Sequence, residues 1–156
     1  MGKTAVAAGH ICIDITPVFS GSADRAKNIG EWLRPGALIQ TLAPDIHSGG
    51  SVANTGLGMK LMGADVRLIG KVGEDEFGLI IRSVLDRYGA GGGLITAPGE
   101  TTSYTVVLSV PGIDRIFLHC PGANDTFDGT EITDRMLEGT ALLHFGYPTL
   151  MAKMYE

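Results

Sequence analysis

The chain has 156 residues, of which 44% are hydrophobic and 19% are charged, and its formal net charge is −5. This length fits one domain with a buried core. The acidic balance argues against nucleic acid and anionic membranes as partners, because the protein would repel phosphate groups, and no apolar stretch approaches the length that spans a bilayer.

The first elements in chain order are two strands. Residues 4–9 form a short apolar run, which predicts a buried strand. Over residues 11–16 isoleucines alternate with smaller or polar residues, so we expect a half-buried strand with Asp14 on its less apolar face. Residues 22–33 are typical of a short helix, and residues 38–42 favour another short strand.

The middle of the chain alternates between helices and strands. Residues 47–50 (HSGG) predict a turn, and residues 52–62 predict a helix directly behind it. Residues 66–72 are a second buried run and predict a strand, which is followed by a helix that begins at residue 75 or 76 and ends near residue 88. Residues 94–96 favour a short strand.

The last third begins with a hairpin. Residues 101–110 alternate over their whole length, and residues 115–119 return after a turn. A helix over residues 131–137 and a strand over residues 141–145 follow. Strands that alternate with helices predict an α/β fold, a Rossmann-like and mostly parallel sheet with flanking helices. The hairpin is too amphipathic for that buried sheet, so we expect it to form a separate flap.

Four residues form a candidate ligand-binding set. Asp14 follows the first buried strand, at the end where open α/β sheets bind ligands. Gly49 and Gly50 precede a helix and leave their backbone N–H groups open to a ligand, and Asn54 lies one turn into that helix. A carboxylate, an amide and bare backbone donors can both accept from and donate to hydroxyls, so this set suits a polyol. The alternative reading is a solvated Asp beside an ordinary Gly-Gly turn.

Other kinds of site find little support in the sequence. No G-x-G-x-x-G opens a helix after a strand, and Gly70-Lys71 is followed by Val72, so no phosphate-binding P-loop is present. The four histidines match no metal-binding spacing, and we predict no metal site. The two cysteines lie more than a hundred residues apart, so they form no disulfide framework, and we expect two small buried side chains.

Four separated motifs, in the order found in the family, resemble the PfkB-type (ribokinase-like) carbohydrate kinases. Residues 48–64 (SGGSVANTGLGMKLMGA) resemble the first signature of that family. They run on into residues 66–78 (VRLIGKVGEDEFG), which are similar to its G-x-V-G-x-D-x-F-G segment. Residues 8–14 (AGHICID) are similar to its first strand, and residues 120–124 (CPGAN) match its G-A-N turn.

The resemblance implies a ribokinase-like fold and a role for each candidate residue. Asp14, Gly49, Gly50 and Asn54 would hold an acceptor sugar or nucleoside, and Thr105, or alternatively Val107, would touch it from a β-lid. The lid would be built from about residues 11–19, 36–46 and 101–120. Closure of a lid excludes water, which would otherwise compete with the sugar hydroxyl for the phosphoryl group. Lids pair between subunits in several family members, which implies a homodimer.

Two departures from the family pattern limit what these residues can do. Tyr147 stands near the place where some members carry a sugar-contacting Glu. The second signature, D-T-x-G-A-G-D, with its catalytic base, is absent from these 156 residues, as is the metal-associated N-x-x-E motif. We therefore expect the amino-terminal part of an enzyme that uses ATP and Mg²⁺, with its catalytic base beyond Glu156. The 156 residues would then hold no catalytic residue, bind neither cofactor tightly and be inactive alone.

Two rival functions remain at this stage. The first is a stand-alone carbohydrate-binding or assembly module without catalysis, and the second is a Rossmann domain of a redox enzyme. The sequence leaves ribose, fructose, a sugar acid, a phosphosugar and a nucleoside open as acceptors. We expect a cytoplasmic protein that exposes an open sheet edge and self-associates through that edge or through the lid.

Overall fold

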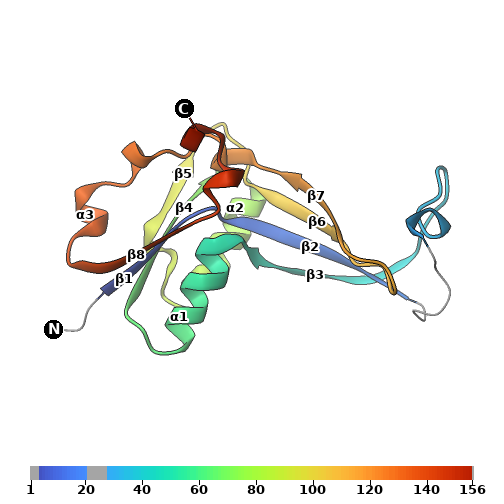
Figure 1. The fold of residues 1–156 in the computed structure, drawn as a ribbon, viewed down its shortest axis with the longest axis horizontal. Coiled ribbons are helices and arrows are strands. Elements are labelled where there is room, and N and C mark those ends of the chain that lie inside the picture. Colours follow the sequence, from blue (N-terminus) through green and yellow to red (C-terminus); the bar gives the residue numbers. More distant parts are fainter. Residues whose placement is uncertain (1–3, 21–27, 156) are drawn as a thin grey trace.

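The computed structural model describes residues 4–20 and 28–155, which form two four-stranded sheets (Figure 1). The first sheet has the strand order β5-β4-β1-β8, and all of its neighbouring strands run parallel. Its strands are β1 (Thr4–Gly9), β4 (Val66–Gly73), β5 (Leu94–Ala97) and β8 (Thr140–Gly146). The predicted α/β class with a mostly parallel sheet is therefore confirmed.

Alternate side chains of β1 enter two hydrophobic clusters, one on each face of the first sheet. Ala5 and Ala7 join the cluster covered by the helical segments η2 (Val52–Leu57) and α1 (Gly58–Leu61) and by helix α2 (Glu76–Asp86). Val6 and Ala8 join the other cluster, which is closed by Phe127, Met151 and neighbouring side chains. Burial on both faces explains why the predicted strands of this sheet are continuous apolar runs.

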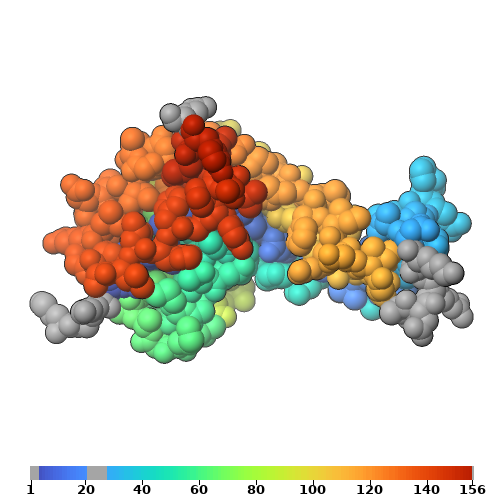
Figure 2. Space-filling view, viewed as in Figure 1, coloured from blue at the N-terminus to red at the C-terminus, as the bar shows by residue number. Residues whose placement is uncertain are grey.

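The second sheet has the order β3-β2-β6-β7 and stands out from one end of the first (Figures 1 and 2). Strand β2 pairs antiparallel with β3 and parallel with β6, while β6 and β7 form the predicted antiparallel hairpin. The four strands are β2 (Cys12–Phe19), β3 (Thr41–Gly49), β6 (Tyr104–Leu108) and β7 (Ile116–Cys120). The sheet is mixed, and a small second sheet of this kind fits the β-lid expected beside the parallel sheet.

Four sequence predictions need correction. The strand predicted over 101–110 covers only Tyr104–Leu108. Residues 47–50 are not a turn, because His47, Ser48 and Gly49 pair with β2 in a continuous ladder. The strand predicted over 38–42 begins only at Thr41. The helix predicted over 131–137 shrinks to α3 (Asp134–Leu137), which follows the 3₁₀ turn η5 (Gly129–Glu131).

Two further predictions fall on residues outside the described part of the chain. The helix predicted over 22–33 lies largely there, and within this range Ile29–Glu31 form the 3₁₀ turn η1. Glu156, beyond which we expect the catalytic base, is also outside the described residues. The position of that base therefore stays a prediction from the family pattern.

Strand β8 ends the first sheet on one side. Leu142 and Leu143 of this strand are 56% and 49% exposed, although both are large apolar residues. Among the described residues, β8 has a neighbouring strand on one side only, so this edge presents apolar surface and is open, as expected. In the described part of the chain, no helix is both long and apolar enough to cross a bilayer.

Asp75 connects the start of helix α2 to the segment that leads into β6. Its side chain accepts from the Gly78 backbone N–H at 2.8 Å and from the Thr102 backbone N–H at 2.7 Å, and Thr102 Oγ1 donates to it as well. Burial acts to raise the pKa of Asp75, but the bonds from Thr102 and Gly78 outweigh it and hold the pKa below its ordinary value. Asp75 therefore caps the helix as a carboxylate.

We expect Asp75→Ala to lower the free energy of unfolding at neutral pH by about 1–2 kcal/mol, the usual cost of a lost helix cap. Because the pKa of Asp75 is lowered in the folded state, its contribution is present above the ordinary carboxyl range and is lost on acidification. Urea unfolding measures both effects, with the exposed neighbour Glu74→Ala as the control. Equal stability of the two variants would contradict this role for Asp75.

Candidate functional site

Strand register brings four polar side chains into one row across the second sheet. Asp14 of β2 pairs with His47 of β3 on one side and with Thr105 of β6 on the other. Thr105 in turn pairs with His119 of β7. Residues paired in this way point to the same face of a sheet. We call His47, Asp14, Thr105 and His119 the polar row.

Side-chain contacts confirm that the polar row shares one face. His47 Nε2 lies 3.8 Å from Asp14 Oδ2, and Thr105 Oγ1 lies 3.0 Å from His119 Nδ1. Cys12, two residues before Asp14, donates its thiol to Asp14 Oδ1 at 3.4 Å and has Thr105 Oγ1 4.0 Å away. Burial and the nearby Asp14 raise the pKa of Cys12 well above its ordinary value, so the thiol stays protonated and can donate.

Gly49 and Gly50 make room for Asp14 and for His10. A Cβ atom on Gly49 would collide with the Asp14 carboxylate, which leans over the bare backbone of β3. Gly50 has a φ of +82°, and a Cβ there would lie 2.5 Å from the His10 carbonyl oxygen and 2.7 Å from His10 Nδ1. The backbone at Gly50 therefore needs glycine both for its positive φ and for its close approach to His10, whereas a larger residue at position 49 would displace the Asp14 carboxylate.

The structure brings only some of the predicted site residues into contact. Asp14 and Thr105 are paired, Gly49 lies under Asp14, and the Asp14 side chain is 21% exposed. Asn54 lies in η2 and is exposed, but no hydrogen bond joins it to Asp14 among the described residues. Val107, the alternative to Thr105, is buried in β6, two residues further along the same face.

The histidines were missed by sequence reasoning because they were tested only against metal-binding spacings. His47 and His119 are the two ends of the polar row, and the described residues contain no cluster of His, Cys, Asp or Glu that could hold a metal ion. Hairpin register is the signal that could have found His119. Pairs in this hairpin are symmetric about Gly112, whose φ is +82°, and that symmetry sets Thr105 opposite His119.

His10 lies behind the row, at the junction between the two sheets. It is 2% exposed, and neither ring nitrogen has a hydrogen-bond partner within the described residues. Its ring centroid lies 5.3 Å from that of His119 and 6.2 Å from that of Tyr147. Burial, followed by the nearby His119, lowers the pKa of His10 to about 4, although Asp14 acts in the opposite direction. The buried imidazole is therefore neutral at physiological pH.

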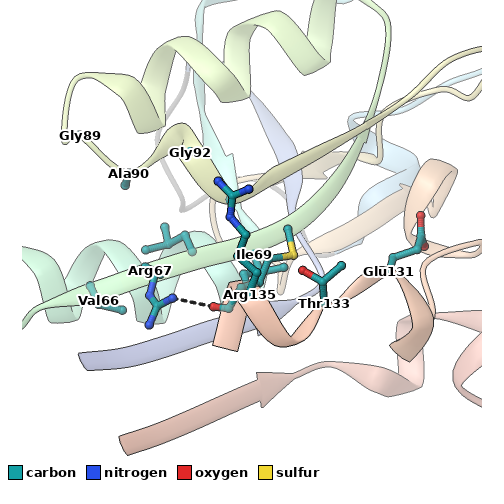
Figure 3. A pocket seen from close by; sticks show the side chains of 12 residues that line it. Val66, Arg67, Ile69, Gly89, Ala90, Gly92, Glu131, Thr133 and Arg135 are labelled. Atoms are coloured by element: carbon teal, nitrogen blue, oxygen red, sulfur yellow. Dashed lines mark hydrogen bonds between the residues drawn. The ribbon is translucent and has the colours of Figure 1, made fainter. Parts of the chain in front are cut away.

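Two pockets of the described part of the chain lie away from the polar row. One, of about 580 Å³, is lined by residues of β4 and by Gly92, Thr133 and Arg135 (Figure 3), and the other, of about 470 Å³, surrounds the start of α2. In the first, the Arg67 guanidinium already donates to the Met136 carbonyl at 2.8 Å, so it has a structural role. We favour the polar row as the site because it gathers the accessible carboxylate and two exposed imidazoles.

The neutral state of His10 predicts acid sensitivity. The folded pKa is about 4 and the ordinary value is 6.5, so the unfolded chain takes up a proton first as the pH falls. We expect stability to decrease from about pH 6.5 towards pH 4, by at most about 3 kcal/mol from this residue. Urea unfolding of His10→Phe should show a weaker loss of stability over this pH window than the wild type. An unchanged pH dependence in His10→Phe would refute this role of His10.

Comparison with known proteins agrees with the resemblance seen in the sequence. A probable chloroplastic fructokinase-6 of Arabidopsis thaliana is 29% identical over 148 residues, which cover 93% of this chain and 35% of that protein. Fructokinase-1 of Oryza sativa subsp. japonica is 28% identical over 97% of this chain and 43% of its own length. The chain thus spans less than half the length of these curated relatives.

Solved structures share the fold at lower sequence identity. Ribokinase from Giardia lamblia superposes with a TM-score of 0.75 at 16% identity, over 93% of this chain and 44% of that one. A putative ribokinase from Agrobacterium tumefaciens gives a TM-score of 0.72 at 18% identity, over 96% of this chain and 47% of that one. The family described as pfkB family carbohydrate kinase matches residues 6–149, so this chain belongs to that family.

Proposed function

We propose that these residues form the acceptor-binding part of an ATP-dependent carbohydrate kinase, which transfers a phosphoryl group to a hydroxyl of a sugar or nucleoside. The proposal rests on one observation: Asp14, an accessible carboxylate, lies in the polar row beside Thr105 and above the bare backbone of Gly49. Gly50 and Asn54 complete the proposed set. Membership of the pfkB family and the likeness to fructokinases support the choice of a sugar.

The chemistry of the polar row suits an acceptor with several hydroxyls. The Asp14 carboxylate can accept hydrogen bonds from neighbouring hydroxyls while Thr105 and the imidazoles can both donate and accept. Hydrogen bonds to a charged group contribute about 1.5–3 kcal/mol each, so Asp14 should be the strongest single contact. In this proposal the second sheet closes over the acceptor as a lid and keeps water from the transferring phosphoryl group.

The donor half of the reaction is assigned to the whole protein and not to these residues. The sequence lacks D-T-x-G-A-G-D, and the described residues gather no cluster of metal ligands, so they do not fit Mg²⁺ and we route no step through it. Phosphoryl transfer depends on positioning and on neutralising the phosphates. We therefore propose that the catalytic base lies beyond Glu156 and that the 156 residues alone are inactive with ATP and a sugar. The runner-up, a binding module without catalysis, would bind sugar equally well.

Association and location are further parts of the proposal. The second sheet exposes apolar side chains at Leu42, Ile46, Phe117 and Leu118, and β8 exposes Leu142 and Leu143. Apolar surface of this kind is usually covered by a partner, so we propose a homodimer through the lid or the sheet edge. A cytoplasmic location, where ATP is available, fits the same function.

A matched pair of amide substitutions tests the acceptor site. Asp14→Asn keeps the shape of the side chain and removes its charge, so we expect affinity for the bound sugar to fall about 10- to 100-fold. Asp114→Asn makes the same change at an exposed residue in the turn before β7, away from the polar row, and should leave affinity unchanged. Titration calorimetry with D-fructose, D-ribose and a nucleoside measures both, and a kinase assay of the same chain checks its inactivity. Equal affinity in the two variants, or phosphorylation by the 156-residue chain, would contradict the proposal.

The two glycines provide a second test because their roles differ. Gly49→Ala should displace the Asp14 carboxylate and lower sugar affinity about tenfold while the fold stays intact, since Gly49 has no positive φ. Gly50→Ala should lower the free energy of unfolding by about 1–2 kcal/mol, because alanine is disfavoured at a φ of +82°. Calorimetry and urea unfolding of both variants separate the effects. A stable, sugar-binding Gly49→Ala chain would show that Asp14 needs no such space.

A further inference from the structure

We infer that His119 is a specificity-determining residue that contacts the acceptor through its Nε2 atom, an inference that rests on the acceptor site proposed above. His119 lies at the end of β7, in register with Thr105 and, through it, with Asp14. It is exposed on the face that carries both of those side chains. Thr105 is one strand away from Asp14, about 5 Å, and His119 is two strands away, about 10 Å. An acceptor held by Asp14 can therefore reach both residues.

A hydrogen bond orients the His119 ring. Its Nδ1 atom lies 3.0 Å from Thr105 Oγ1. Among the described residues, the ring forms its hydrogen bond with Thr105. Since Nδ1 is engaged, Nε2 is the atom that remains for a ligand. A neutral imidazole bonded in this way has one ring nitrogen left, with a defined role as hydrogen-bond donor or acceptor. That nitrogen can distinguish sugars by the position of a hydroxyl group.

The buried ring of His10 limits where His119 can turn. His10 lies 5.3 Å from His119, centroid to centroid, and is 2% exposed, so it closes the space on the inner side of the ring. Tyr147, which follows β8, adds an edge-on ring contact to His10. Its backbone has a φ of +58°, and the residue is 53% exposed. The three rings come from three separate elements and meet where the second sheet joins the first.

Charge around the polar row favours an uncharged part of the acceptor at His119. The ion pairs in the row and beside it are those of His47 with Asp14 and Asp45. No described Lys or Arg forms a hydrogen bond or ion pair with a member of the row. An anionic group at this position would meet the Asp14 carboxylate without a cation to offset it. We therefore assign His119 to a hydroxyl of the acceptor and not to a phosphate or carboxylate.

Amide substitutions that mimic one ring nitrogen at a time test the inference. Glutamine places a polar atom near the Nε2 position, whereas asparagine reaches only the Nδ1 position and can still bond Thr105. We expect His119→Asn and His119→Ala to weaken binding of D-fructose or D-ribose about 5- to 10-fold, the scale of one neutral hydrogen bond, and His119→Gln to stay within about threefold of the wild type. Ile116→Ala, at another exposed residue of β7 on the face opposite to His119, is the control and should bind normally.

A spectroscopic measurement distinguishes a direct contact between His119 and the sugar from a purely structural role of His119. In the wild-type chain, long-range ¹⁵N spectra should show the Nε2 resonance of His119 shift on saturation with the sugar. Loss of binding in Asp14→Asn together with normal binding in His119→Ala would overturn this inference and leave the acceptor site standing. Tighter binding by His119→Asn than by His119→Gln would also overturn it, because Nδ1 would then be the important atom. No sugar binding by the wild-type chain would overturn both the acceptor site and the inference.

Discussion

The amide of Asn124 holds the place where the chain passes from one sheet to the other. Its Oδ1 atom accepts from the Ile11 backbone N–H at 3.2 Å, and its Nδ2 donates to the Ile11 carbonyl at 2.8 Å. Both residues are fully buried, so an unsatisfied backbone group here would cost the full desolvation penalty. Because Ile11 lies between β1 and β2, this pair of bonds sets the direction in which β2 leaves the first sheet. The place of Asp14 depends on that direction.

The same junction collects most of the chemistry of the molecule. The His10 carbonyl accepts from the Val52 backbone N–H at 3.1 Å, which anchors the start of the first crossover helix beside the junction. The His10 N–H donates to the Gly146 carbonyl at the end of β8. Carboxyl ends of parallel strands and a helix start therefore meet at one point, which is where open α/β sheets bind their ligands. The second sheet adds a wall of paired polar side chains to this position.

Sequence reasoning succeeded where local pattern and tertiary packing agree. The buried runs of β1 and β4 and the 3.6-residue periodicity of α2, with Ile81 and Leu85 facing the core, were readable directly. It failed at residues 47–50, where a composition typical of turns is overridden by the ladder between β2 and β3. It also extended the helix before β8 too far, because Ile132 leaves helical dihedral angles and packs against the second hydrophobic cluster.

By itself the sequence determined the α/β class, most strand and helix positions and the motifs that mark the family, because these depend on local spacing of apolar residues, glycines and polar side chains. Asp14, Gly49 and Thr105 could also be selected individually. Only the tertiary structure decided that His47, Asp14, Thr105 and His119 form one row with His10 behind it. Strand register joins residues far apart in the chain through backbone hydrogen bonds, and a shift of one residue would turn these side chains to the other face.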